Sequence, residues 1–134
     1  MRKEVKPQLL YVDDEPFNLV VLKTTLSGSF DIITSDKPEE AVEIFKSNPT
    51  IQLVLSDYCM PGMNGMELIK TIKHINSQAL CFILSGYDKT DEVLEAIENE
   101  VLMDYFIKPF SPEILSKKLL SAFNMSVKAD VFAH

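Results

Sequence analysis

Reactive side chains recur directly after the short apolar segments of this 134-residue chain. In chain order they are Asp13 and Asp14, Asp57, Ser85, and Lys108. Carboxylates gathered at one edge of a sheet would repel one another, and at least one would be pushed toward its neutral form. A hard cation with oxygen ligands removes that cost, and Mg²⁺ commonly takes one or two carboxylates together with water and phosphate oxygens. The acids therefore indicate a divalent-cation site.

A lysine and a serine complete this set of polar groups. Lys108 supplies a positive charge that can face an anion, and the hydroxyl of Ser85 supplies one more hydrogen-bond donor. An aspartate can act as the covalent nucleophile in phosphoryl transfer. Acids, lysine and hydroxyl together predict a pocket for a phosphoryl group and its metal ion.

The segments before these residues are typical of β-strands that are buried on both faces. Their apolar residues are mostly continuous rather than alternating, as in a parallel sheet covered by helices on both sides. The predicted strands are 8–12, 31–35, 51–56, 79–84 and 104–107. A helical pattern follows each strand, so we expect an α/β fold with a doubly wound parallel sheet. Ligands of such sheets lie at the carboxyl ends of the strands.

The composition bounds the class of protein. The length fits one domain, and 46% hydrophobic with 25% charged residues is ordinary for a globular chain. No apolar stretch approaches the roughly 20 residues of a membrane span, and the net charge of −7 argues against direct nucleic-acid binding. Two cysteines cannot form a disulfide framework. We expect a reduced, cytoplasmic protein without a membrane or nucleic-acid partner.

Four sequence motifs carry a family resemblance. They are LLYVDDE at 9–15, LVLSDYCMPGMNG at 53–65, FILSG at 82–86 and YFIKPF at 105–110. With them the chain resembles the receiver domain of two-component response regulators and is chemotaxis-receiver-like, from Leu9 to about Phe123. The resemblance implies a flavodoxin-like sheet of five parallel strands in the order 2-1-3-4-5 with five helices.

The resemblance also implies roles for the acids. Asp57 is expected to be the phosphoacceptor, which receives its phosphoryl group from a histidine of a sensor histidine kinase or phosphotransfer protein. Asp14, Asp57 and the backbone carbonyl of Cys59 are expected to ligate Mg²⁺, and Asp13 to assist through water.

Three further residues receive implied roles. Lys108 is expected to pair with the acyl phosphate, and Ser85 to donate a hydrogen bond to it. Tyr105 occupies the position of the family's aromatic switch, and we expect it to turn from solvent into space vacated when Ser85 moves toward the phosphoryl group. The peptide bond between Lys108 and Pro109 is a candidate for the cis form.

The resulting hypothesis is a phosphorylation-dependent signalling switch and not an enzyme for outside substrates. Residues 1–124 form the receiver, and 125–134 extend the last helix or form a tail. The chain is either a stand-alone receiver or the N-terminal piece of a larger regulator with an unknown output. One alternative is a receiver-like interaction module that works without phosphorylation. A weaker one is an aspartate-nucleophile phosphohydrolase such as the haloacid dehalogenase type, whose Asp-x-Asp differs from the adjacent Asp13 and Asp14.

Overall fold

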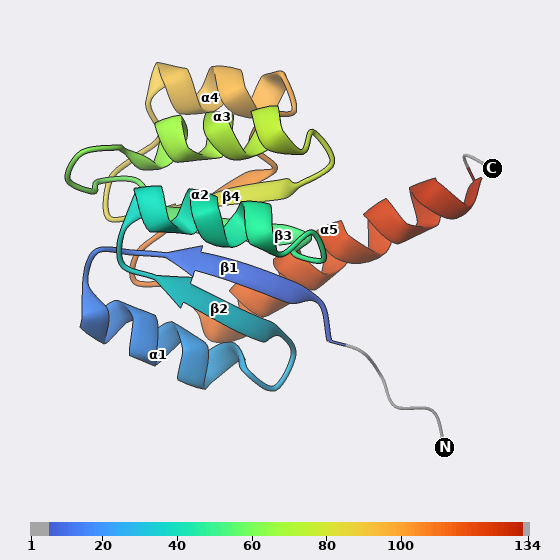
Figure 1. Ribbon diagram of the computed structural model, residues 1–134, viewed down its shortest axis with the longest axis horizontal. Coiled ribbons are helices and arrows are strands. Elements are labelled where there is room, and N and C mark those ends of the chain that lie inside the picture. The colour runs from blue at the N-terminus through green and yellow to red at the C-terminus, as the bar shows by residue number, and fades with distance from the viewer. Residues whose placement is uncertain (1–5, 133–134) are drawn as a thin grey trace.

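A single parallel sheet forms the centre of the computed structural model, which describes residues 6–132. Its strands lie side by side in the order β2-β1-β3-β4-β5, and all four neighbouring pairs are parallel. The predicted α/β fold and strand order are confirmed (Figure 1). The strands are β1 (Gln8–Val12), β2 (Asp31–Ser35), β3 (Leu53–Asp57), β4 (Leu80–Ser85) and β5 (Asp104–Ile107).

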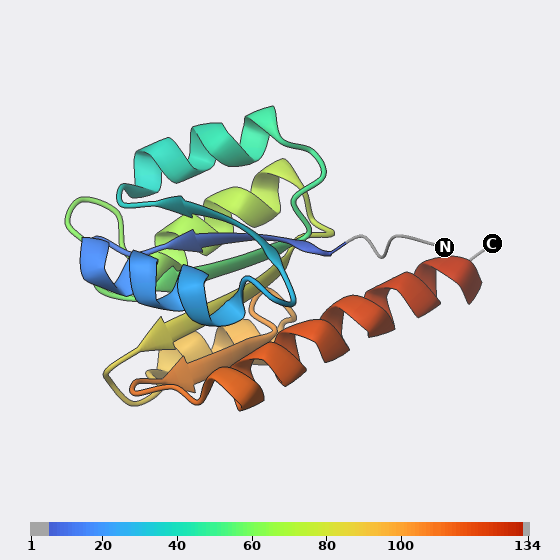
Figure 2. The same ribbon diagram turned by 90° about the horizontal axis from the view of Figure 1, so that it is seen from below.

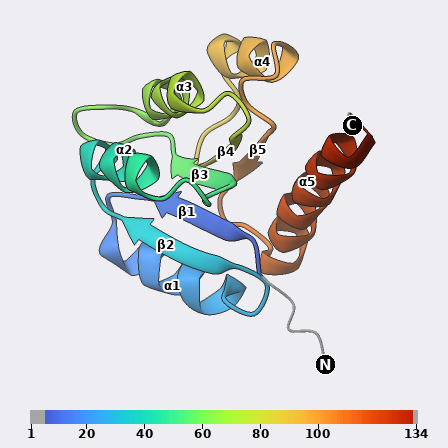
Figure 3. The ribbon, with the colours of Figure 1, turned by 45° about the vertical axis from the view of Figure 1, so that its right-hand side comes forward.

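Between residues 6 and 132, five helices cover the two faces of the sheet. Helices α1 and α5 lie on one face, and α2, α3 and α4 lie on the other (Figure 3). Each helix follows its strand in sequence, which gives the βαβ crossovers of a doubly wound fold. The helices are α1 (Pro16–Leu26), α2 (Pro38–Ser47), α3 (Gly65–Ile75), α4 (Asp91–Glu98) and α5 (Pro112–Phe132).

Alternation along each strand divides the core into two layers. In β1, Leu9 and Tyr11 pack toward α1 and α5, whereas Leu10 and Val12 pack toward α2 and α3. All four side chains are buried. Burying one such aliphatic side chain contributes about 1.5–3 kcal/mol to folding. Because both faces are covered, the residues of β1 from Leu9 to Val12 are apolar without interruption.

Two strands extend one residue further than the apolar pattern predicted. Strand β3 includes Asp57, which is in register with Leu84 of β4. Strand β4 includes Ser85, which is in register with Ile107 of β5. The backbone pairing continues regardless of side-chain polarity, so both polar side chains lie on the rigid sheet rather than on loops.

Helix α5 continues well beyond the edge of the sheet. It has 21 residues and ends at Phe132, so the segment from Met125 to Phe132 is helical (Figure 2). Of the two forms predicted for 125–134, the structure has the helical extension, and residues 133–134 lie outside the described range. None of the helices between residues 6 and 132 combines the length and apolar content needed to cross a membrane.

Glu100, in the turn after α4, has a left-handed backbone conformation with φ of +62°. This region costs an ordinary residue roughly 1–2 kcal/mol, whereas glycine enters it freely but loses more entropy on folding. Glu100→Gly should therefore raise the free energy of unfolding by about 0.5–1 kcal/mol, measured by urea denaturation. The control Glu95→Gly, within α4, should instead lower it by about 1 kcal/mol. A loss of stability in Glu100→Gly would mean that the glutamate side chain holds this turn.

Candidate functional site

The carboxyl ends of the central strands bring three aspartates together. Strands β1 and β3 are neighbours, and the strand order reverses between them. Asp13 and Asp14 follow β1 and Asp57 ends β3; each offers a carboxylate oxygen, and these oxygens lie within 4.8 Å of one another. Asp13 and Asp57 are buried and Asp14 is partly exposed. We call these three residues the acid pocket.

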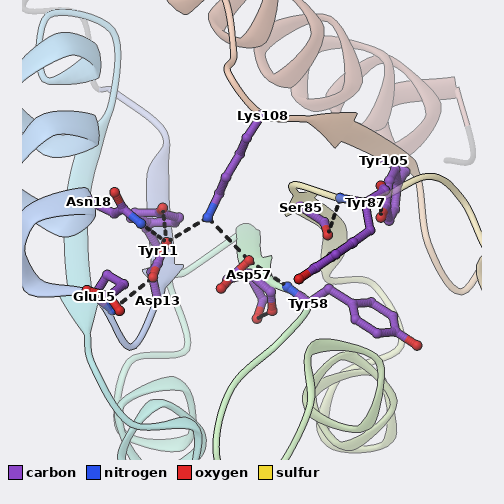
Figure 4. A network of polar contacts seen from close by, with 11 residues as sticks. Tyr11, Asp13, Glu15, Asn18, Asp57, Tyr58, Ser85, Tyr87, Tyr105 and Lys108 are labelled. Atoms are coloured by element: carbon purple, nitrogen blue, oxygen red, sulfur yellow. Dashed lines mark hydrogen bonds and ion pairs between the residues drawn. The ribbon is translucent and has the colours of Figure 1, made fainter.

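Lys108 reaches the acid pocket from the edge strand β5. It follows β5, and its Nζ lies 3.3 Å from Asp13 Oδ2 and 3.3 Å from Asp57 Oδ1 (Figure 4). Its backbone N–H donates to the carbonyl of Ser85 at 2.7 Å, which fixes the lysine beside β4. The Lys108–Pro109 peptide is cis, as predicted. One ammonium group thus bridges two buried carboxylates.

The electrostatics of the pocket favour a bound cation. Burial raises the pKa of Asp57 above its ordinary value, and the charge of Asp13 acts in the same direction, while Lys108 and the Tyr58 amide oppose them. Burial lowers the pKa of Lys108, but Asp13 and Asp57 outweigh this effect and leave it raised. The lysine therefore stays charged, yet it does not fully offset the cost of ionising Asp57.

The two oxygens of Asp57 are in different situations. Oδ1 accepts hydrogen bonds from the Tyr58 N–H at 3.0 Å and from Lys108 Nζ at 3.3 Å. Within residues 6–132, no protein donor is hydrogen-bonded to Oδ2. A carboxylate oxygen without a donor retains its lone pairs for a cation or for attack on an electrophile.

The loop after β3 brings its backbone close to Asp57. The Gly65 N–H, at the start of α3, donates to the carbonyl of Tyr58 at 2.7 Å. A Cβ atom at Gly65 would overlap the Asp57 carbonyl oxygen, so this approach requires glycine. Cys59 lies in the same loop with an exposed side chain. The predicted use of its carbonyl as a metal ligand stays a prediction.

Ser85 and Tyr105 both bond to the backbone of one residue. The Tyr87 N–H donates to Ser85 Oγ at 3.2 Å, and the Tyr105 hydroxyl donates to the Tyr87 carbonyl at 2.6 Å (Figure 4). Tyr105 is only 6% exposed. The expectation that its ring starts in solvent is wrong for this conformation. The ring packs in the core, and its hydroxyl is hydrogen-bonded to the loop after β4.

Two residues to which the sequence analysis assigned no role also contact Asp13. Its Oδ2 accepts from the Tyr11 hydroxyl at 2.7 Å and from Asn18 Nδ2 at 3.2 Å. Burial and then the hydrogen bond to Asp13 raise the pKa of Tyr11 far above its ordinary value, so this hydroxyl remains a donor. The sequence did contain a signal for Tyr11. Residues two apart on a strand face the same side, which places Tyr11 beside Asp13.

Comparison with known proteins decides the family. The family model described as response regulator receiver domain matches residues 9–120. The chain belongs to this family. Over 117 residues the receiver domain is 31% identical to a chemotaxis protein CheY homolog from Campylobacter jejuni, a match that covers 84% of this chain and 88% of that protein. It spans only 22% of another relative, the hydrogenase transcriptional regulatory protein HoxA from Cupriavidus necator, at 27% identity.

Solved structures agree with this assignment. A response regulator receiver domain protein from Clostridium thermocellum superimposes with a TM-score of 0.81 and 27% identity, covering 96% of this chain and 99% of that one. The CheX-CheY-BeF3-Mg complex from Borrelia burgdorferi gives a TM-score of 0.79 and 26% identity, with 87% and 89% covered.

The family also sets the general role of this chain. Receiver domains are generally signalling modules of two-component systems rather than enzymes for outside substrates, and they interact with histidine kinases or phosphotransfer proteins. They generally bind Mg²⁺ at an acidic pocket. The acid pocket here fits that ion, since three carboxylates offer closely spaced oxygens, the hard ligands that Mg²⁺ prefers.

Proposed function

We propose that this receiver domain accepts a phosphoryl group on Asp57 in a Mg²⁺-dependent reaction and thereby changes its partner-binding surface. One observation carries the proposal. Asp57 lies between two other carboxylates and Lys108, and its Oδ2 has no hydrogen bond from within residues 6–132. This is the arrangement needed for an aspartate that attacks phosphorus while positive charge faces the phosphoryl oxygens.

The transfer step can be written with these residues. Asp57 Oδ2 attacks the phosphorus of the donor, an O–P bond forms, and the bond between phosphorus and the donor's histidine nitrogen or acyl oxygen breaks. Its electron pair leaves with the donor. The Lys108 ammonium group, which lies 3.3 Å from Asp57 Oδ1, turns toward the phosphoryl oxygens and stabilises their negative charge. The product is an acyl phosphate on Asp57.

Asp14 and Asp57 are the proposed direct Mg²⁺ ligands together with the Cys59 carbonyl, and Asp13 acts through water. When bound, Mg²⁺ supplies positive charge that offsets the carboxylates and the incoming phosphoryl oxygens. The BeF3 and Mg named for the Borrelia burgdorferi CheY complex support the same ligand chemistry here. The proposed partner upstream is a sensor histidine kinase or phosphotransfer protein, and the proposed receiver unit is residues 1–124.

Acetyl phosphate provides the direct test. Incubated with this donor and Mg²⁺, the protein should gain one phosphoryl group, seen as a single adduct by intact-mass spectrometry. Removing divalent cations with EDTA should reduce the rate at least about 100-fold, because the acids then repel the anionic donor without compensation. Equal rates with and without chelator would contradict the metal-dependent mechanism. The complete absence of an adduct would favour a module that works without phosphorylation.

The signal is proposed to leave the pocket through the loop after β4. Ser85 Oγ now accepts from Tyr87, and drawing it toward a phosphoryl oxygen breaks that bond. The Tyr87 carbonyl holds Tyr105, so the position of the ring follows the loop. Phosphorylation then shifts a two-state element at the surface of α4, β5 and α5.

Ser85→Ala tests this link. With beryllofluoride and Mg²⁺, NMR of the wild-type protein should show chemical-shift changes from Asp57 through Tyr87 and Tyr105 into α4. Ser85→Ala should confine them to the acid pocket, because the methyl group cannot donate to the fluoride. The control Ser121→Ala, on the exposed side of α5, should behave as the wild type. Identical long-range changes in Ser85→Ala would show that its hydroxyl does not couple the two regions.

A further inference from the structure

Asp13 is held more completely than the other acids. It is fully buried, and its Oδ2 accepts from Tyr11, Asn18 and Lys108 while its Oδ1 accepts from the Glu15 N–H at 2.9 Å (Figure 4). The Tyr11 hydroxyl makes the shortest of these bonds, 2.7 Å against 3.3 Å for Lys108.

We propose that Tyr11 and Asn18 are positioning residues that fix Asp13 for Mg²⁺ independently of Lys108. The inference rests on the proposed function, in which the acid pocket holds the metal ion. The motifs gave neither residue a role, although Tyr11 lies within LLYVDDE. Both act through the orientation of one carboxylate, and neither would touch the ion.

The geometry separates the donors into two groups. Lys108 approaches from β5 and is shared with Asp57 at equal distance. Tyr11 and Asn18 approach from β1 and α1 and contact only Asp13 within the pocket. When Lys108 turns to a phosphoryl group on Asp57, Asp13 loses that donor but keeps Tyr11, Asn18 and the Glu15 N–H. The carboxylate therefore stays in place in both states of the switch.

The same contacts oppose the competition between Lys108 and the metal ion. A carboxylate free to rotate would swing toward the lysine and form a closer ion pair at the expense of the cation. Tyr11 and Asn18 occupy Oδ2 and leave one lone pair of Oδ1 facing away from the Glu15 N–H. Partners that orient metal-binding carboxylates in this manner typically change affinity 10- to 100-fold when they are removed.

Tyr11→Phe isolates the hydrogen bond. The ring is 1% exposed and packs in the core beneath α1 and α5, and phenylalanine keeps that packing. Asn18→Ala is the second variant, at a partly exposed position in α1 where alanine suits the helix. Thr25→Val is the matched control. The Thr25 hydroxyl also lies on α1, but it donates only to backbone carbonyls of that helix.

Calorimetric titration with Mg²⁺ measures the effect. Tyr11→Phe and Asn18→Ala should each weaken binding about tenfold, while Thr25→Val should match the wild type. At saturating Mg²⁺, acetyl phosphate should phosphorylate both variants to the wild-type level, since only the affinity for the ion has changed. In a Lys108→Ala background the loss caused by Tyr11→Phe should be smaller, because the lysine toward which the freed carboxylate would turn is gone.

Each outcome decides a separate question. Wild-type affinity in both Tyr11→Phe and Asn18→Ala overturns the positioning role while leaving the proposed function intact. A lower final level of phosphorylation at saturating Mg²⁺ also overturns the positioning role, because Tyr11 and Asn18 would then do more than orient the Asp13 carboxylate. If Tyr11→Phe fails to fold, Asn18→Ala decides. No Mg²⁺ binding by the wild-type protein would remove the proposed function and this inference together.

Discussion

Asp57→Asn is expected to yield no phosphoryl adduct after incubation with acetyl phosphate and Mg²⁺, where the wild-type protein gains one. The amide lacks the anionic oxygen that attacks phosphorus, and it removes one of the three carboxylates whose oxygens lie within 4.8 Å. Mg²⁺ affinity should fall at least about tenfold for the same reason. Intact-mass spectrometry and calorimetry measure the two effects.

The same substitution should stabilise the protein in the absence of metal. Burial and Asp13 raise the pKa of Asp57, so its neutral form is favoured in the folded state. The stability that this residue contributes is therefore greatest at low pH and is lost as pH rises through its folded pKa. At neutral pH an uncharged asparagine avoids that loss, and urea denaturation with EDTA should show a higher free energy of unfolding.

Asp31→Asn is the matched control for both measurements. It makes the same chemical change on an exposed residue at the opposite end of the sheet, in β2. It should leave the adduct, the Mg²⁺ affinity and the stability close to wild type. An adduct that persists in Asp57→Asn on another residue would falsify the assignment of Asp57 as the phosphoacceptor.

Lys108→Ala should separate metal binding from phosphoryl transfer. Without its charge near Asp57, phosphorylation by acetyl phosphate should slow about 100-fold, as when one group that stabilises developing charge is removed. Mg²⁺ affinity should instead rise severalfold, because a positive charge that competes for Asp13 and Asp57 is gone. Mass spectrometry of samples quenched at successive times measures the phosphorylation rate, and calorimetry measures the Mg²⁺ affinity.

Stability should show the structural part of the lysine's role. In EDTA, Lys108→Ala leaves two buried carboxylates without their shared cation and should lower the free energy of unfolding by about 2 kcal/mol. Saturating Mg²⁺ should recover most of this loss. Lys118→Ala, which breaks an exposed pair with Asp104, should change stability by less than about 0.5 kcal/mol. A collapse of Mg²⁺ binding in Lys108→Ala would show that the lysine organises the carboxylates rather than competing with the ion.

Much of the fold followed from the sequence for a local physical reason. Apolar runs such as 8–12 can be buried only when both faces of a strand are covered, which requires helices on both sides of a parallel sheet. The polar residue after each run marks where the strand leaves the core. The acids and the lysine could therefore be assigned to one edge of the sheet from the sequence alone.

The sequence could not show which donors each carboxylate would receive. The strand period places Tyr11 on the same side as Asp13, but it also fits an ordinary core position, and only the side-chain rotamers bring its hydroxyl to Asp13 Oδ2. Asn18 had no distinguishing spacing at all. Hydrogen bonds between side chains depend on rotamers and on the distance between elements, and neither quantity is encoded in periodicity.

The orientation of Tyr105 was decided in the same way. Its position in β5 was evident from the sequence, but only the structure shows that its ring packs in the core and that its hydroxyl donates to the Tyr87 carbonyl at 2.6 Å. Apolar runs and the polar residues after them were enough to predict a parallel sheet and the identities of its charged groups, and the family resemblance implied the strand order. The tertiary structure decided that one lysine is shared equally by two acids and that Asp57 keeps one oxygen without a donor from residues 6–132, because both facts depend on distances across four strands.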